Sequence, residues 1–208
     1  MTIDWLKLIA ALALLLTPVA WFHGRGVHHR ELSRDWDGYW RATLTLWTHA
    51  FDLIRAILGA WLLVEALNRA PGAQGLLNYG HWAGRGLVLC AAAILQTVIC
   101  RERDAMNAPF AFVIGLVVSL LPPMAAALGL ILGGMVAFGT HMRTLFFPVL
   151  AVSSAGLGAL FLGKKLPLDL AGIGTAALLP WLLPVLFHRH AVCAYRARKR
   201  GKDLDTLK

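Results

Sequence analysis

The stretch AMNAPFAFVIGLVVSLLPPMAAALGLILGGMVAFGT, residues 105–140, decides the fold class of this chain. It contains no charged residue, and about 20 apolar residues are enough for a helix to cross the hydrocarbon core of a membrane. Pro122 and Pro123 remove two backbone donors and push Leu121 out of the helical conformation. The stretch therefore predicts two helices, Ala105–Leu121 and Met124–Thr140, joined by a tight hairpin. One kinked helix and a re-entrant hairpin are the alternatives left open.

Five further apolar runs flank this pair, and we expect each to form a helix: Trp5–Phe22, Thr43–Leu67, Trp82–Cys100, Thr144–Gly163 and Leu168–His188. Hydrophobic residues make up 58% of the chain and charged residues only 15%, whereas roughly 25% are charged in typical soluble proteins. The sequence thus predicts an all-α integral membrane protein with about seven transmembrane helices. The G-x-x-x-G spacing of Gly129 and Gly133 favours close packing within the chain over dimerisation.

Basic residues are concentrated beside the apolar runs. Seven of the 20 lysines and arginines lie between Arg189 and Lys208, and four lie between Arg25 and Arg41. Such clusters mark cytoplasmic membrane edges, so we expect the N-terminus outside and the C-terminus inside. Residues 1–190 would form the transmembrane bundle, and residues 191–208 would form a basic cytoplasmic tail that attracts anionic lipid headgroups. The net charge of +9 follows from this arrangement and does not indicate nucleic-acid binding.

Three ionisable residues lie three positions apart in the second apolar run: His49, Asp52 and Arg55. On a helix they form a contiguous face, and Asp52 and Arg55 are spaced to pair. Ionisable groups inside a membrane are costly and frequently functional. The cluster is therefore interpreted either as a functional intramembrane site or as a structural ion pair that faces neighbouring helices. The three cysteines and eight histidines show no metal-ligand spacing, so we expect neither a metal nor a cofactor.

Three places in the sequence resemble one known family. Asp52-Leu53-Ile54-Arg55-Ala56 is similar to an Asp-x-x-Lys-Gly motif, and Arg189-His190 followed by Arg196 is similar to a terminal Arg-His-x-x-Asn-x-x-Arg motif. The proline-containing helix pair at 105–140 is the third. These features resemble the bacterial acyl-phosphate:glycerol-3-phosphate acyltransferases of phospholipid synthesis. The resemblance implies a multi-pass protein of the bacterial inner membrane that acts on glycerol 3-phosphate or a related phosphorylated acceptor.

The resemblance also implies roles for particular residues. Ser33 and His190 would be catalytic, and five arginines would bind phosphate: Arg41, Arg101, Arg103, Arg189 and Arg196. Three family motifs are altered here, one of them because Cys193 stands where the terminal motif has asparagine. Ser33 and Arg41 match the first cytoplasmic motif only with shortened spacing, and the glycine-rich loop is missing. Its glycines would cradle phosphate through backbone N–H groups, so activity is expected to be changed or lost.

Two other classes of function remain open from the sequence. The first is a non-catalytic subunit or scaffold of a larger membrane complex, with a partner membrane protein docked on the basic tail or on the aromatic segment 36–47. The second is a small transporter, because a proline-broken helix near buried ionisable groups is a feature of transporter substrate sites.

Overall fold

Seven α-helices make up most of the chain that the computed structural model describes, namely residues 3–18, 26–28, 47–67, 76–100, 105–140, 142–162 and 167–195. Each predicted helix is present, at a shorter length in most cases. The bounds are α1 Trp5–Leu16, α4 Trp47–Ala66, α5 Leu76–Val98, α6 Phe110–Leu120, α7 Pro123–Gly139, α8 Phe146–Leu162 and α9 Pro167–Leu186. A short 3₁₀ turn, η2 Arg143–Leu145, precedes α8.

The prediction that these helices cross a membrane is wrong. Within the described ranges, no helix has both the length and the apolar character that a membrane span requires. Four helices have only 11 to 17 residues, against the roughly 20 needed. Among the longer helices, the apolar sequence of α4 contains the charged residues Asp52, Arg55 and Glu65, and that of α5 contains Arg85 and Gln96. The predicted orientation of the termini and the predicted location in a bacterial inner membrane both depended on such spans, so they are wrong as well.

Local chemistry explains where several helices begin and end. Asp4 caps α1, because its side chain accepts a hydrogen bond from the Lys7 backbone N–H at 3.2 Å. The predicted break at the double proline is confirmed: α6 ends at Leu120, Leu121 is extended, and Pro123 opens α7. Proline suits that first helical position, where its missing N–H is not needed.

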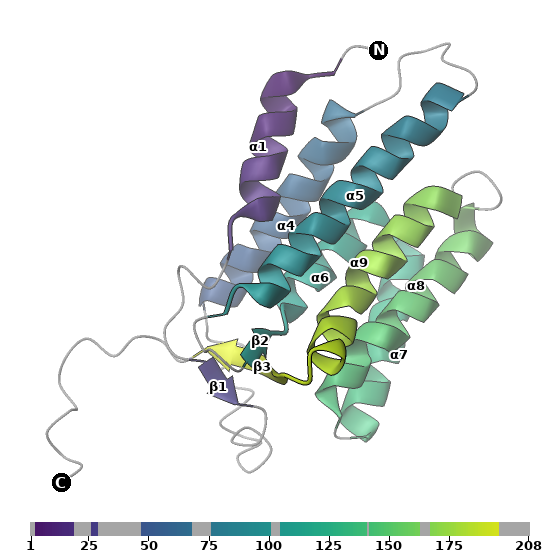
Figure 1. Ribbon diagram of the computed structural model, residues 1–208. Coiled ribbons are helices and arrows are strands. Elements are labelled where there is room, and N and C mark those ends of the chain that lie inside the picture. The colour runs from purple at the N-terminus through teal and green to yellow at the C-terminus, as the bar shows by residue number, and fades with distance from the viewer. Residues whose placement is uncertain are drawn as a thin grey trace, which may run out of the picture.

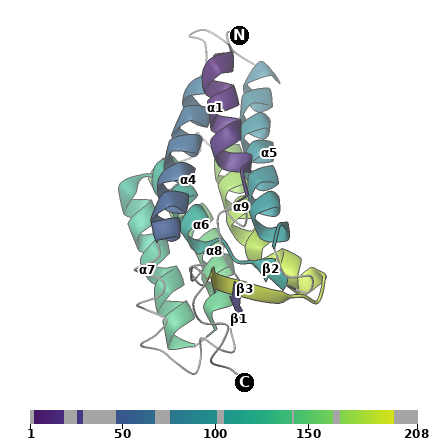
Figure 2. The same ribbon diagram turned by 90° about the vertical axis from the view of Figure 1, so that its left-hand side faces the viewer.

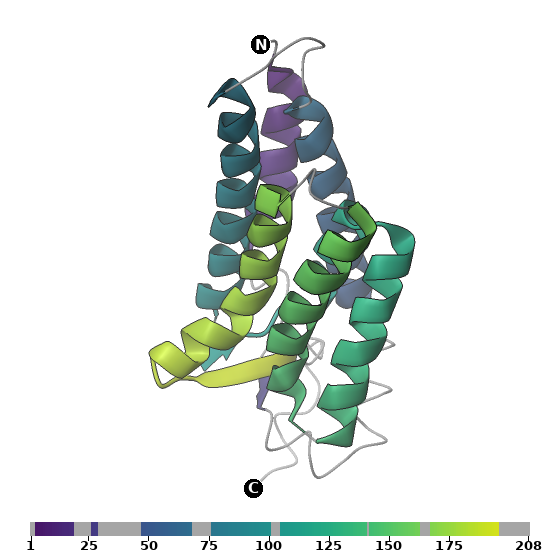
Figure 3. The ribbon, with the colours of Figure 1, turned by 90° about the vertical axis from the view of Figure 1, so that its right-hand side faces the viewer.

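The helices pack as a series of neighbouring pairs (Figures 1 and 3). Helix α1 lies against α4, and α4 against α6. Helix α5 packs along α9, α9 packs along α8, and α8 packs along α7. Gly129 and Gly133 of α7 face Leu150 and Phe146 of α8 at 3.5 and 3.2 Å from where a Cβ would stand. The predicted use of the G-x-x-x-G spacing for packing within the chain is therefore confirmed.

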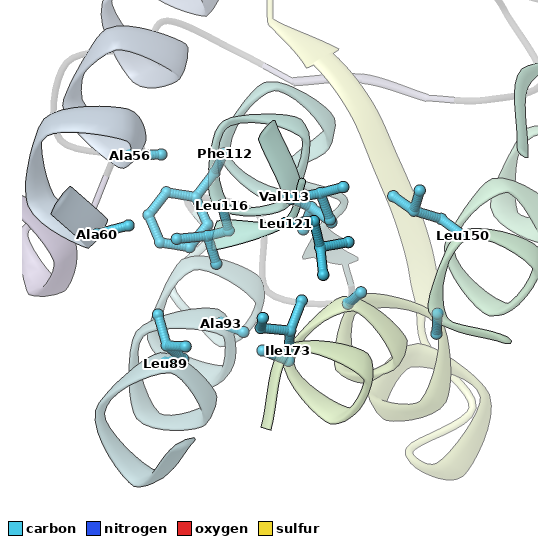
Figure 4. Packing of buried hydrophobic residues seen from close by; sticks show 14 of the residues in the cluster. Ala56, Ala60, Leu89, Ala93, Phe112, Val113, Leu116, Leu121, Leu150 and Ile173 are labelled. Carbon is cyan, nitrogen blue, oxygen red and sulfur yellow. The ribbon is translucent and has the colours of Figure 1, made fainter. Parts of the chain in front are cut away.

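The core lies where α6 meets α4, α5 and α9 (Figure 4). The Phe112 ring is fully buried beside the small side chains of Ala56 and Ala60 on α4. Gly115 brings the two backbones together, because an added Cβ would stand 2.7 Å from the Ala56 Cβ and 2.8 Å from the Leu53 carbonyl oxygen. Helices α4 and α6 thus touch through small residues.

A small sheet closes one end of the bundle and was not predicted (Figures 1 and 2). Its strands are β1 Gly26–His28, β2 Ala105–Asn107 and β3 His190–Tyr195, in the order β1-β3-β2. Strand β3 is antiparallel to β1 and parallel to β2. The described start of α1 lies at the opposite end of the bundle. The predicted boundary between bundle and tail falls at the first residues of β3, and residues 196–208 of that tail lie outside the described ranges.

Candidate functional site

The sheet brings together three segments that are far apart in the sequence. His190 is the backbone partner of Ala105, and Val192 partners both Asn107 and His28. Strand β2 begins two residues after Arg103 in the sequence, and β3 begins immediately after Arg189. The start of β2 and the start of β3 therefore lie side by side at one end of the bundle.

The end of α9 sets the position of Arg189. His188 has a left-handed backbone conformation, with φ of 53°, and the Arg189 N–H donates to the Pro184 carbonyl at 2.9 Å. This is the hydrogen bond of a Schellman-type helix end, in which the residue after the left-handed one bonds back into the last turn. The His188 ring Nδ1 lies 3.0 Å from the Val185 carbonyl oxygen. Arg189 follows the end of the helix, and this residue is exposed.

The other predicted catalytic and phosphate-binding residues lie mostly outside the described part of the chain. The described ranges do not include Ser33, Arg41, Arg101, Arg103 and Arg196. For His190 the described structure covers the backbone, in β3. Their roles remain predictions.

The predicted pair of Asp52 and Arg55 is present and deeply buried. Arg55 Nη2 donates to Asp52 Oδ1 at 2.5 Å, and the two residues are only 3% and 2% exposed. The Arg55 guanidinium also lies 5.6 Å from the centre of the Phe112 ring, a cation–π distance. Both side chains are almost completely enclosed by the protein.

The same cluster holds the end of α1. Arg55 Nη1 donates to the Thr17 carbonyl, and Gln96 Nε2 donates to the carbonyls of Leu15 and Thr17 at 3.1 and 2.7 Å. The last carbonyls of a helix have no partner within it and carry partial negative charge, so a cation and an amide satisfy them well. Asn107 Nδ2, in β2, donates to the Gln96 carbonyl at 3.0 Å. The cluster thus connects α1, α4, α5 and the sheet.

Burial governs the protonation of the cluster. It raises the pKa of the Asp52 carboxyl above its ordinary value, while the charge of Arg55 and its hydrogen bond oppose that rise. Burial also lowers the pKa of His49, one turn earlier on α4. Arg55 Nε has no hydrogen-bond partner among the described residues. Because Arg55 already serves Asp52 and Thr17, this donor is the least satisfied group of the cluster.

Sequence reasoning missed Gln96 and Asn107, which complete the cluster. The signal was a single glutamine at the end of an otherwise apolar run, since a buried amide needs partners of its own. It also missed Arg85, which the structure places beside a cavity.

Among the described side chains, no three histidine, cysteine or acidic residues group in a way that would hold a metal ion. Comparison with known proteins yields no match to any protein family, curated protein or solved structure. The likeness to the acyltransferases therefore rests on the sequence motifs alone.

Proposed function

We propose that the sheet end of the bundle binds the phosphate of a small phosphorylated acceptor, such as glycerol 3-phosphate, and that the chain transfers an acyl group to it. The observation that carries this proposal is the β1-β3-β2 pairing, which sets Ala105, the first residue of β2, beside His190, the first residue of β3. In the sequence, Arg189 immediately precedes β3, and Arg101 and Arg103 shortly precede β2.

Arg189 is the described residue best suited to the phosphate. It is exposed, and the helix-end hydrogen bonds fix the backbone from which its side chain extends. A guanidinium offers a planar fork of donors that matches phosphate oxygens, and such charge-assisted bonds are about twice as strong as neutral ones. Arg101 and Arg103 precede β2 by four and two residues in the sequence and would add further positive charge.

The proposed reaction is an acyl transfer from an acyl phosphate. The acceptor hydroxyl oxygen forms a bond to the acyl carbonyl carbon, the bond from that carbon to the phosphate oxygen breaks, and inorganic phosphate leaves. His190 accepts the hydroxyl proton. An imidazole has an ordinary pKa near 6.5, which suits a general base at neutral pH.

The test is an assay of acyl transfer to glycerol 3-phosphate, from acyl phosphate and separately from acyl-CoA. We expect His190→Ala to lower kcat by about 10²- to 10⁴-fold, the usual contribution of a general base. Arg189→Ala is expected mainly to raise KM for glycerol 3-phosphate. Lys7→Ala is the matched control, because Lys7 is a cation on α1 at the other end of the bundle.

Three results would contradict the proposal. One is a folded protein without turnover from either donor, and another is turnover that His190→Ala leaves unchanged. The third is equal loss of activity in the Lys7→Ala control, which would indicate a general effect of charge.

A second candidate function, a non-catalytic subunit, is favoured by a different observation. Helix α7 buries a face of small residues, and its other face exposes six large apolar side chains: Met124, Leu128, Ile131, Leu132, Met135 and Phe138. Contiguous apolar patches of this kind mark interaction sites. In this case a partner protein covers the exposed face of α7. The chain is then expected to form a stable complex with that partner and to turn over no substrate.

A further inference from the structure

Asn107 is a buried polar residue in the short strand β2. Asparagine is depleted in β-strands, because its side chain tends to hydrogen-bond nearby backbone groups in place of the ladder. Asn107 is nevertheless only 3% exposed, and its neighbours Met106 and Ala108 have the same exposure. A buried amide needs hydrogen-bond partners within the protein. Its position in β2 therefore depends on a contact with another part of the fold.

That contact is with the end of α5, beside which β2 lies (Figures 1 and 2). Asn107 Nδ2 donates to the Gln96 carbonyl, in the last turn of the helix, at 3.0 Å. The helix stops just beyond, where the Cys100 N–H donates to the Val98 carbonyl at 2.9 Å. The last carbonyls of a helix look for donors outside it, and the Asn107 amide supplies one. The bond therefore ties β2 to the bundle.

The same bond closes a loop. It joins residues 96 and 107, and the sequence between them contains Arg101 and Arg103, two of the predicted phosphate-binding residues. Bringing the ends of a loop together removes part of its conformational freedom. Asn107 thus fixes one end of the stretch of chain that carries both arginines.

Strand pairing extends the effect of Asn107 to β3. Asn107 is the backbone partner of Val192, and Ala105, two residues earlier in β2, is the backbone partner of His190. Paired strands stay about 4.8 Å apart, so a displacement of β2 would carry the start of β3 with it. The position of the His190 backbone therefore depends on the bond between Asn107 and α5.

We infer that Asn107 is a positioning residue for the proposed acyl transfer, because its bond to the Gln96 carbonyl sets β2, and with it the backbone of His190, relative to the bundle. The catalytic part of this inference rests on the proposed function, whereas the tie between β2 and α5 does not. Asn107 acts through His190 in this role. A displacement of about 1 Å at a reacting group can lower a rate by about 10²-fold.

The kinetics of acyl transfer separate positioning from a simple loss of stability. Asn107→Leu keeps a side chain of similar size and removes the donor, so we expect kcat per folded molecule to fall by about 10²-fold. Asn107→Ser keeps a donor of shorter reach and should lower kcat less. Thr97→Val is the matched control, because the Thr97 hydroxyl is also buried but donates within α5, to the Ala93 carbonyl at 2.7 Å. This variant should leave kcat and KM unchanged.

Amide hydrogen exchange tests the same tie without any turnover. In the unaltered chain, the amides of β2 and β3 should open in the same denaturant-dependent step as the last turn of α5, because segments that are tied together open as one unit. Asn107→Leu should speed exchange in both strands by about tenfold, the effect of losing a buried hydrogen bond. Thr97→Val should leave the exchange of the strands unchanged.

Two results would overturn the inference. One is an active unaltered chain whose folded Asn107 variants keep its kcat, and the other is exchange of the strands that is independent of the end of α5. The second measurement needs only the unaltered chain, so it decides the matter even if neither Asn107 variant folds. An unaltered chain without turnover would contradict the proposed acyl transfer and the catalytic role of Asn107, and exchange would still show whether Asn107 fixes the strands.

Discussion

Arg55 is a charged residue that links three parts of the core. It binds Asp52, the end of α1 through the Thr17 carbonyl, and the face of Phe112. Sequence spacing predicted its pairing with Asp52, because residues three apart on a helix are neighbours. The sequence could not predict the contact with Thr17, because nothing local indicates which helix end will meet which side chain.

The buried pair is open to a double-mutant test. Arg55→Met should destabilise the protein by about 3–5 kcal/mol, because it leaves the Asp52 carboxylate buried without its partner. The double variant Asp52→Leu/Arg55→Met should cost clearly less than the sum of the two single changes. Urea denaturation of the four proteins measures the coupling. Additive effects would show that the pair does not act as a unit.

His49 gives the stability of the protein a pH dependence. Burial lowers its folded-state pKa below the ordinary 6.5, so the unfolded chain binds the proton more readily. Full stability is present above 6.5 and is lost as pH falls from 6.5 toward the lowered folded pKa. His49→Gln should remove this part of the slope when unfolding free energies are compared at several pH values between 5 and 8. Parallel curves for the two proteins would contradict the assignment.

At the scale of elements, the helix positions were predictable and the strands were not. Long apolar runs and the double proline locate the helices, because their signals lie within one segment. Strands β1 and β2 have only three residues each, too few for an alternating pattern. Strand β3 was interpreted as the beginning of a basic tail. Its pairing partners lie more than 80 residues earlier in the chain, and local sequence carries no information about them.

The close crossing of α4 and α6 depends on Gly115, which has no side chain. Gly115→Ala should destabilise the protein by about 1–3 kcal/mol, since the new Cβ would press on Ala56 and on the backbone at Leu53. Gly156→Ala, in α8, is the matched control. Nothing lies within 4 Å of its added Cβ, so the better helix propensity of alanine should stabilise the protein by up to about 1 kcal/mol. Thermal denaturation compares the two, and equal effects would contradict close packing at Gly115.

At the scale of the whole molecule, composition was a misleading guide. A chain with 58% hydrophobic residues predicts membrane spans, but composition does not record where each helix stops or where its polar residues fall. In α4 and α5 the polar residues lie within the helices, and several of them are used in packing: Asp52, Arg55 and Gln96 are buried together. For the candidate site, strand pairing places the backbone of His190 beside Ala105 of β2, and the roles of His190 and Arg189 stay predictions. The cavity at Arg85 was not foreseen.

The apolar face of α7 provides a test of the subunit reading. Ile131→Lys and Met135→Lys should abolish association with a partner, because each places a charge on the exposed face. The fold should tolerate both, since these side chains are 56% and 67% exposed. Light scattering and cross-linking measure association, with Leu160→Lys on α8 as the control. Unchanged association in both α7 variants would place the contact elsewhere.

The order of the strands also has a consequence for biosynthesis. Strand β3 stands between β1 and β2 and is the last of the three to be translated. At 5–20 residues per second, the ribosome reaches β3 roughly 4–17 s after β2. Throughout that interval β1 and β2 have no strand to pair with, while the helices from α6 to α9 are emerging. The sheet is therefore completed after the helices of the nascent protein have emerged. A chain arrested before residue 190 would contain the helices but would lack β3, and with it the sheet that closes the bundle.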